Sequence, residues 1–169
     1  KQLMEEVGIS PKDMNPKAIL GSISNAKNQL IGPNDFSKYV KSAFTEKVAM
    51  LYPMYQKHLK RNNALDFDDL IMKTVELFRN HPDILNENQE KFRYISVDEY
   101  QDTNHAQYIL IKLLAAKYKN LCVIGDEDQS IYSWRGATVK NIMEFEKDYP
   151  EACVVLLEQN YRSTQVILD

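Results

Sequence analysis

The sequence contains little glycine and little cysteine, and it has no long apolar run. Its five glycines lie at positions 8, 21, 32, 125 and 136, and none is followed by Lys and then Ser or Thr, as a GxxxxGK[ST] phosphate-binding loop requires. No stretch of about 18 uncharged apolar residues is present. The first residues lack the basic-then-apolar pattern of a secretory signal. We therefore expect no membrane segment and a cytoplasmic location.

The two cysteines, Cys122 and Cys153, each lie within an apolar run. This setting suits buried free thiols better than a disulfide or a metal site. The length of 169 residues allows one domain with a substantial core, or one domain and part of another.

The charges are unevenly distributed, although the net charge is only −3. Residues 1–61 carry ten Lys and Arg against five Asp and Glu, a net charge of +5, whereas residues 62–169 carry eleven against nineteen, a net charge of −8. A basic first third is typical of a nucleic-acid surface, but a modest lysine excess on helices is more often a solvated face. Charge alone leaves both interpretations open.

The first third of the sequence predicts helices. Amphipathic patterns cover residues 1–8 and 16–31, and a longer helix is expected over 36–63. Pro53 should kink or break this longer helix. No strand-like alternation occurs before residue 92, so we expect this part to be entirely helical.

From Asp66 the pattern changes to α/β. A helix is expected up to Pro82, because the apolar residues follow helical spacing. The remaining expected elements are strands at 94–97, 120–126 and 152–160, a helix capped by Thr103 after the first strand, and a helix over 138–149 after the second. Strands that alternate with helices favour a parallel sheet, in which ligands bind beyond the carboxyl ends of the strands.

Polar segments follow all three expected strands, and the first is YISVDEYQDTN at 94–104. A strand that ends in Asp98 and Glu99 can offer one carboxylate to Mg²⁺ and use the next to activate a water molecule. Two exposed acids at a strand end are also common without any function. Asp98, Glu99 and Asp102 together leave a third possibility, a metal-dependent nuclease, although such sites usually need further ligands.

The second segment is GDEDQSIYSWRGA at 125–137. Its DxDxS start resembles a calcium loop, but Ile131 and Ala137 stand where such a loop needs Gly and Glu, so we reject that interpretation. The loop still carries an amide, two aromatic rings and a guanidinium group, which suit a stacking platform for unpaired bases: Gln129, Tyr132, Trp134 and Arg135. Trp134 suits a core or interface anchor equally well.

The third segment is EQNYRST at 158–164. Arg162 could stabilise charge on a phosphate, as arginine does in phosphoryl transfer. A surface arginine without a ligand is the commoner case, so this segment alone is a weak signal.

Together and in this order, DEYQDTN, GDEDQSIYSWRGA and LEQNYRST resemble motifs II, III and IV of the superfamily 1 DNA helicases of the UvrD, Rep and PcrA type. The ALDFDDL stretch at 64–70 and the lysine-bearing helical segment ahead of it resemble the same family. Within this family the match as a whole most resembles the PcrA group. The resemblance implies a helical insertion subdomain over residues 1–63 that contacts duplex DNA. Residues 64–169 would be the later part of a RecA-like motor domain of the P-loop NTPase type.

The resemblance also implies an activity and a role for each motif residue. The activity would be that of an ATP-dependent 3′–5′ DNA helicase or translocase acting in replication or repair. Asp98 and Glu99 would hold Mg²⁺, and Glu99 would activate the hydrolytic water. The remaining roles would be sensing the terminal phosphate of ATP (Gln129), stabilising its charge (Arg162), packing on adenine (Tyr161), and contacting single-stranded DNA (Tyr132, Trp134 and Arg135).

The sequence departs from this family pattern in lacking the phosphate-binding loop and its strand. We therefore expect a fragment that needs a second RecA-like domain of its parent protein and hydrolyses ATP negligibly by itself. The alternative is a non-catalytic module that binds nucleic acid or a protein partner on a degenerate motor scaffold. A GxxxxGK[ST] motif in the parent protein, ahead of residue 1, would decide for the helicase.

Overall fold

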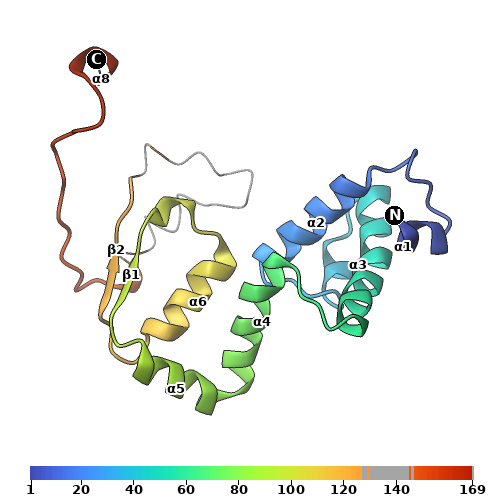
Figure 1. Cartoon of the computed structure of the whole chain (residues 1–169), viewed down its shortest axis with the longest axis horizontal. Coiled ribbons are helices and arrows are strands. Elements are labelled where there is room, and N and C mark those ends of the chain that lie inside the picture. Colours follow the sequence, from blue (N-terminus) through green and yellow to red (C-terminus); the bar gives the residue numbers. More distant parts are fainter. Residues whose placement is uncertain (127–128, 130–144, 146, 169) are drawn as a thin grey trace.

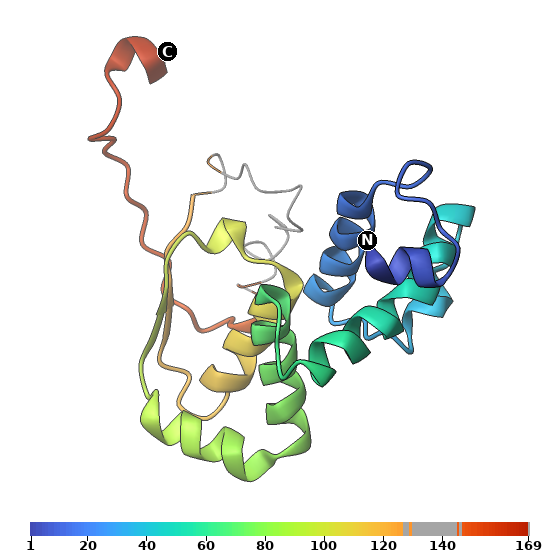
Figure 2. The same ribbon diagram turned by 45° about the vertical axis from the view of Figure 1, so that its right-hand side comes forward.

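The computed structural model describes residues 1–126, 129, 145 and 147–168. Figure 1 shows two neighbouring groups of elements: helices α1 to α3 on one side, and helices α4 to α6 with a small sheet on the other. Figure 2 shows the same grouping after a turn, with the last residues running away from the sheet toward the C-terminus. In the part of the chain that the structure describes, no helix is both long enough and apolar enough to cross a membrane.

The first group is helical, as the sequence predicts. It consists of α1 (Gln2–Glu6), α2 (Pro16–Asn28), the 3₁₀ turn η1 (Phe36–Tyr39) and α3 (Ala43–Arg61). Its buried apolar side chains form one core: Met4, Ile9, Ile19, Ile23, Ala26, Phe36, Val48, Leu51 and Tyr52. All nine lie within residues 1–63, so these helices share a core of their own, and α2 packs in addition against α4 and α6 of the second group.

The expected helix over 36–63 differs from the observed one in two respects. It is divided, because Ser42 forms a capping box with Thr45 and starts α3 at Ala43. It is also not broken at Pro53, which lies inside the continuous α3. Val48 and Leu51 are buried just ahead of the proline, and this packing holds the helix together where a backbone hydrogen bond is lost.

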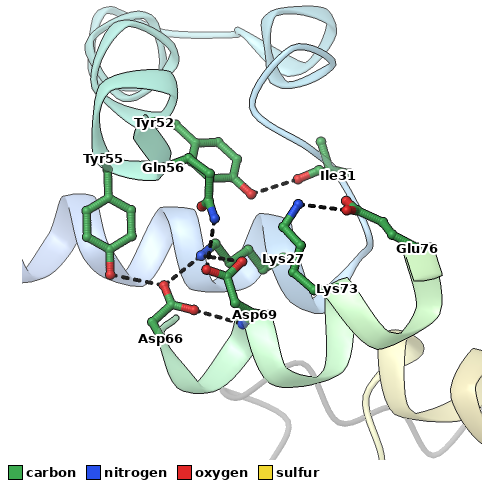
Figure 3. A network of polar contacts seen from close by, with 9 residues as sticks. All are labelled: Lys27, Ile31, Tyr52, Tyr55, Gln56, Asp66, Asp69, Lys73 and Glu76. Carbon is green, nitrogen blue, oxygen red and sulfur yellow. Dashed lines mark hydrogen bonds and ion pairs between the residues drawn. The ribbon is translucent and has the colours of Figure 1, made fainter. Parts of the chain in front are cut away.

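A buried ionic network joins the two groups of elements, and Figure 3 shows it closely. Lys27 of α2 has a fully buried side chain, and its Nζ lies 2.6 Å from Asp66 Oδ2 and 3.0 Å from Asp69 Oδ1. Tyr55 and Gln56 of α3 donate hydrogen bonds to the same two carboxylates, at 3.0 and 2.8 Å respectively. Side chains of α2 and α3 are thereby fixed to the start of α4.

Asp66 also caps the N-terminus of helix α4. It is the N-cap of α4 (Phe67–Asn80), and its Oδ1 accepts a hydrogen bond of 2.8 Å from the Asp69 N–H. Burial opposes ionisation of Asp66, but the hydrogen bonds from Lys27, Asp69 N–H and Tyr55 outweigh it and hold the pKa of Asp66 below its ordinary value. Desolvation, followed by the neighbouring carboxylates, raises the pKa of Tyr55.

The second group contains α4, α5 (Pro82–Lys91) and α6 (His105–Ala115). Pro82 ends the predicted helix as expected, but it also starts α5, because proline is accepted at the first position of a helix. The cap of α6 is Asn104, which forms a capping box with Gln107, so the prediction of Thr103 was wrong by one residue. The expected helix over 138–149 lies mostly outside the described residues.

Two of the three expected strands are present. The strands β1 (Ile95–Val97) and β2 (Leu121–Val123) pair in parallel, with Ile95 opposite Leu121. The fold is therefore α/β, although the described part of the sheet has only these two strands. The prediction of a strand within 152–160 was wrong: this segment is irregular, and Leu157 is 85% exposed. A strand needs a partner ladder, and in this structure the segment runs away from the sheet (Figure 2).

The cysteines also differ from the prediction, since both thiols are free but exposed. Cys122 is the middle residue of β2, and both its side chain and that of the paired Ser96 are exposed while their strand neighbours are partly buried. An apolar run predicts a strand, but it does not show that both faces of that strand are covered.

Candidate functional site

The site begins where β1 ends, at Asp98 and Glu99. Both side chains are exposed, and Asp98 Oδ1 accepts a hydrogen bond of 2.9 Å from the Glu99 N–H. Glu99 adopts a left-handed backbone conformation, with φ of 51° and ψ of 43°. A non-glycine residue in this region carries backbone strain, and such residues concentrate at functional sites.

A 3₁₀ turn, η2 (Tyr100–Asp102), connects this strand end to the end of β2. The Tyr100 N–H donates to Ile124 O at 2.9 Å. The buried Gln101 donates from Nε2 to Glu99 Oε2 at 2.6 Å, and its Oε1 accepts from the Asp126 N–H at 3.0 Å. The segments that follow β1 and β2 are therefore held together by backbone and side-chain hydrogen bonds.

The same series of contacts continues into the second and third polar segments. Gln129 Nε2 donates to Asp126 Oδ2 at 2.6 Å, and Gln129 Oε1 accepts from Arg162 Nη1 at 3.0 Å. Asn160 supports the arginine, because its Oδ1 accepts the backbone N–H groups of Arg162 and Ser163, both at 2.9 Å. Four hydrogen bonds thus connect Glu99 to Arg162 through Gln101, Asp126 and Gln129.

The structure therefore brings together three of the residues that the sequence singled out from three separate segments: Glu99, Gln129 and Arg162. Tyr161 precedes the arginine and is 91% exposed. Tyr132, Trp134 and Arg135, which the resemblance assigns to single-stranded DNA, lie outside the described residues. In the described ranges, no group of three or more His, Cys, Asp or Glu side chains is placed to hold a metal ion.

The carboxylates at the end of β1 are of the kind that could contribute to a Mg²⁺ site. Mg²⁺ is usually bound by one or two carboxylates together with water and substrate phosphates. The exposed Asp98 carboxylate, oriented by the Glu99 N–H, can provide one such ligand. Glu99 Oε2 already accepts a hydrogen bond from Gln101, so the other carboxylate oxygen is the one that can bind a water molecule.

Sequence reasoning missed Gln101 and Asp126. Gln101 lies two residues after Glu99, and Asp126 lies three residues before Gln129. Gln101 carries no pattern of its own, and Asp126 belongs only to the calcium-loop pattern that was rejected. Only the turn at Tyr100–Asp102, which folds Gln101 back onto Glu99, reveals the connection.

Comparison with known proteins now decides the family. A family profile described as the UvrD/REP helicase N-terminal domain matches residues 1–150. The chain belongs to the UvrD/Rep helicase family. The resemblance to this family is thereby confirmed.

Several members of the UvrD/Rep family are similar to the chain along its whole length. It is 56% identical over 168 residues to a protein of Bacillus subtilis named ATP-dependent DNA helicase PcrA, covering 99% of this chain. Proteins with the same name from Leuconostoc citreum and Staphylococcus aureus are 54% and 56% identical, and each alignment covers 100% of this chain. The chain spans 23% of the length of each of these relatives.

Proposed function

We propose that the chain is the part of an ATP-dependent DNA helicase that supplies the acidic side of the ATP site. The observation that carries this proposal is the hydrogen-bonded series from Glu99 through Gln101, Asp126 and Gln129 to Arg162. The names of the PcrA relatives and the family match support it. The activity would be 3′–5′ movement along single-stranded DNA, in replication or repair.

In this proposal the side chains divide the chemistry of phosphoryl transfer between them. Glu99 orients the attacking water and accepts its proton, while Arg162 stabilises charge on the transferred phosphate. Gln129, which contacts Arg162 at 3.0 Å, responds to the terminal phosphate. Mg²⁺, held in part by Asp98, would supply charge neutralisation on the phosphate oxygens.

The two groups of elements would correspond to a motor domain and a DNA-binding helical subdomain. Residues 64–169 would belong to the first RecA-like domain, facing a second such domain of the same parent protein. Residues 1–63 would be the helical insertion that lies against duplex DNA, and their separate apolar core supports this division. The loop with Tyr132, Trp134 and Arg135 would contact single-stranded DNA.

The experiment that tests the proposal is a Glu99→Gln substitution in the full-length helicase that carries this segment. We expect the DNA-stimulated ATPase kcat to fall by a factor of about 10² or more, because the amide cannot accept the proton from water. The matched control is Glu87→Gln, an exposed acid of α5, which should keep wild-type kcat. Wild-type kcat in Glu99→Gln would show that Glu99 is not the base.

A further inference from the structure

We propose that Gln101 is a positioning residue for Glu99, which holds the carboxylate of the base in place and ties it to the loop that carries Gln129. This inference rests on the proposed function, because it takes Glu99 as the base. It begins from an unusual feature of Gln101: the side chain is completely buried, and both ends of its amide contact the polar segments.

The chemistry of the two partners fixes the orientation of the amide. A backbone N–H can only donate, so the Gln101 oxygen must face the Asp126 N–H. The amide nitrogen must then face Glu99, where it donates at 2.6 Å to Oε2. A flipped amide would place two donors together at Asp126 and two acceptors together at Glu99.

This orientation prepares Glu99 for its proposed task. One carboxylate oxygen is occupied by a buried donor, which restricts rotation of the side chain and leaves the other oxygen for water. The Glu99 backbone is held in the left-handed conformation by the turn that contains Gln101. The base is therefore held at two points, through its backbone and through its carboxylate.

The second contact of Gln101 connects the base to the phosphate-facing side chains. The Asp126 N–H donates to Gln101, and Asp126 Oδ2 accepts a hydrogen bond of 2.6 Å from Gln129 Nε2. A shift of the segment with Gln129 would move Asp126, and the amide of Gln101 would pass this shift to Glu99. Gln101 thus lies in a continuous hydrogen-bonded series between Glu99 and Gln129.

The experiment uses steady-state ATPase kinetics of the full-length helicase with Gln101→Met, which keeps the length of the side chain and removes both hydrogen bonds. We expect kcat to fall about 10- to 100-fold while KM for ATP changes less than about twofold, because the base is misplaced but the nucleotide is still bound. The double variant Glu99→Gln/Gln101→Met should lose no more than Glu99→Gln alone, because Gln101 acts through Glu99.

The matched control is Gln89→Met, which removes another buried glutamine, whose Nε2 donates to Leu113 O at 2.7 Å. It should lower the melting temperature and leave kcat unchanged. If Gln101→Met does not fold, Gln101→Glu replaces it: this variant keeps an oxygen for the Asp126 N–H but loses the donor to Glu99, and its kcat should also fall.

The inference is overturned if the folded Gln101 variant keeps kcat within about twofold of wild type, or if its loss lies in KM. It is also overturned if the double variant loses clearly more than Glu99→Gln alone. These outcomes differ from failure of the proposed function, in which Glu99→Gln itself would retain wild-type kcat.

Discussion

At the scale of single residues, the buried charge of Lys27 shows how the ALDFDDL stretch is used. Its first and last aspartates, Asp66 and Asp69, bind Lys27, and the middle one, Asp68, is partly buried in the first turn of α4. An unpaired buried charge is very unfavourable, so each member of this network depends on the others. Lys27 is therefore a structural residue, although it is one of the ten basic residues that suggest a DNA-binding surface.

Replacing Lys27 should strongly destabilise the fold. Lys27→Met leaves the fully buried Asp69 without its cation, and we expect the free energy of unfolding to fall by about 3–5 kcal/mol. Urea unfolding of the purified chain, followed by circular dichroism, measures this change.

The control for this change is Lys73→Met on α4, also shown in Figure 3. Lys73 pairs with Glu76 at 2.7 Å, but the two side chains are 39% and 42% exposed, so its loss should cost about 0–1 kcal/mol. Equal losses in the two variants would contradict a special role for the buried network.

At the scale of elements, helix α3 is the clearest departure from sequence expectation. Pro53 lies in its interior and is exposed, and the helix continues for eight residues beyond it to Arg61. Local propensity is here overridden by packing of Val48, Leu51 and Tyr52 in the first core. The proline should therefore be a local weakness in an element that tertiary contacts maintain.

Replacing the proline should stabilise the chain. In Pro53→Ala the backbone regains an N–H that can donate within α3, and we expect an increase of about 1–3 kcal/mol in the free energy of unfolding. The control is Pro11→Ala, outside any helix. It should lower the free energy of unfolding by about 0.4–1 kcal/mol, because the unfolded chain gains conformational freedom. Loss of stability in Pro53→Ala would mean that the packing of α3 requires the proline.

Sequence patterns predicted those elements whose signal is local. Helices α1, α2, α4 and α6 and the strands β1 and β2 follow from apolar spacing, because each buries a face that its own residues define. Helix α5 was not predicted. The segment 152–160 has an equally apolar composition, but it forms no strand because strand formation depends on a partner that composition does not specify. The turn that places Gln101 against Glu99 depends on a left-handed glutamate, for which the sequence gives no signal.

At the scale of the whole molecule, the uneven charge has a consequence for DNA binding. Residues 1–61 carry a net charge of +5, and Lys27 is unavailable to a ligand because it is buried and paired. The remaining basic residues of this part include Lys57 and Lys60, which are exposed on α3. The rest of the chain carries a net charge of −8, so we expect duplex DNA to bind chiefly on residues 1–61.

The purified chain should therefore bind duplex DNA weakly through residues 1–61, with an affinity that falls as salt rises. Lys57→Glu/Lys60→Glu should abolish this binding, as measured by fluorescence anisotropy with a labelled duplex at low salt. The control variant Lys91→Glu/Lys119→Glu makes the same charge change at exposed positions outside this part and should reduce affinity much less. Equal effects of the two variants, or binding that does not respond to salt, would contradict a DNA surface on α3.

The central claim is that three segments, far apart in the sequence, form one phosphate site. Arg162 tests it most directly, because its described contact with the site is the hydrogen bond to Gln129. In the full-length helicase, Arg162→Ala should lower the DNA-stimulated ATPase kcat by about 10³-fold or more, as loss of a charge-stabilising arginine does. Arg79 is exposed on α4, and Arg79→Ala should leave the DNA-stimulated ATPase kcat unchanged. A kcat for Arg162→Ala that equals that of Arg79→Ala would contradict the claim.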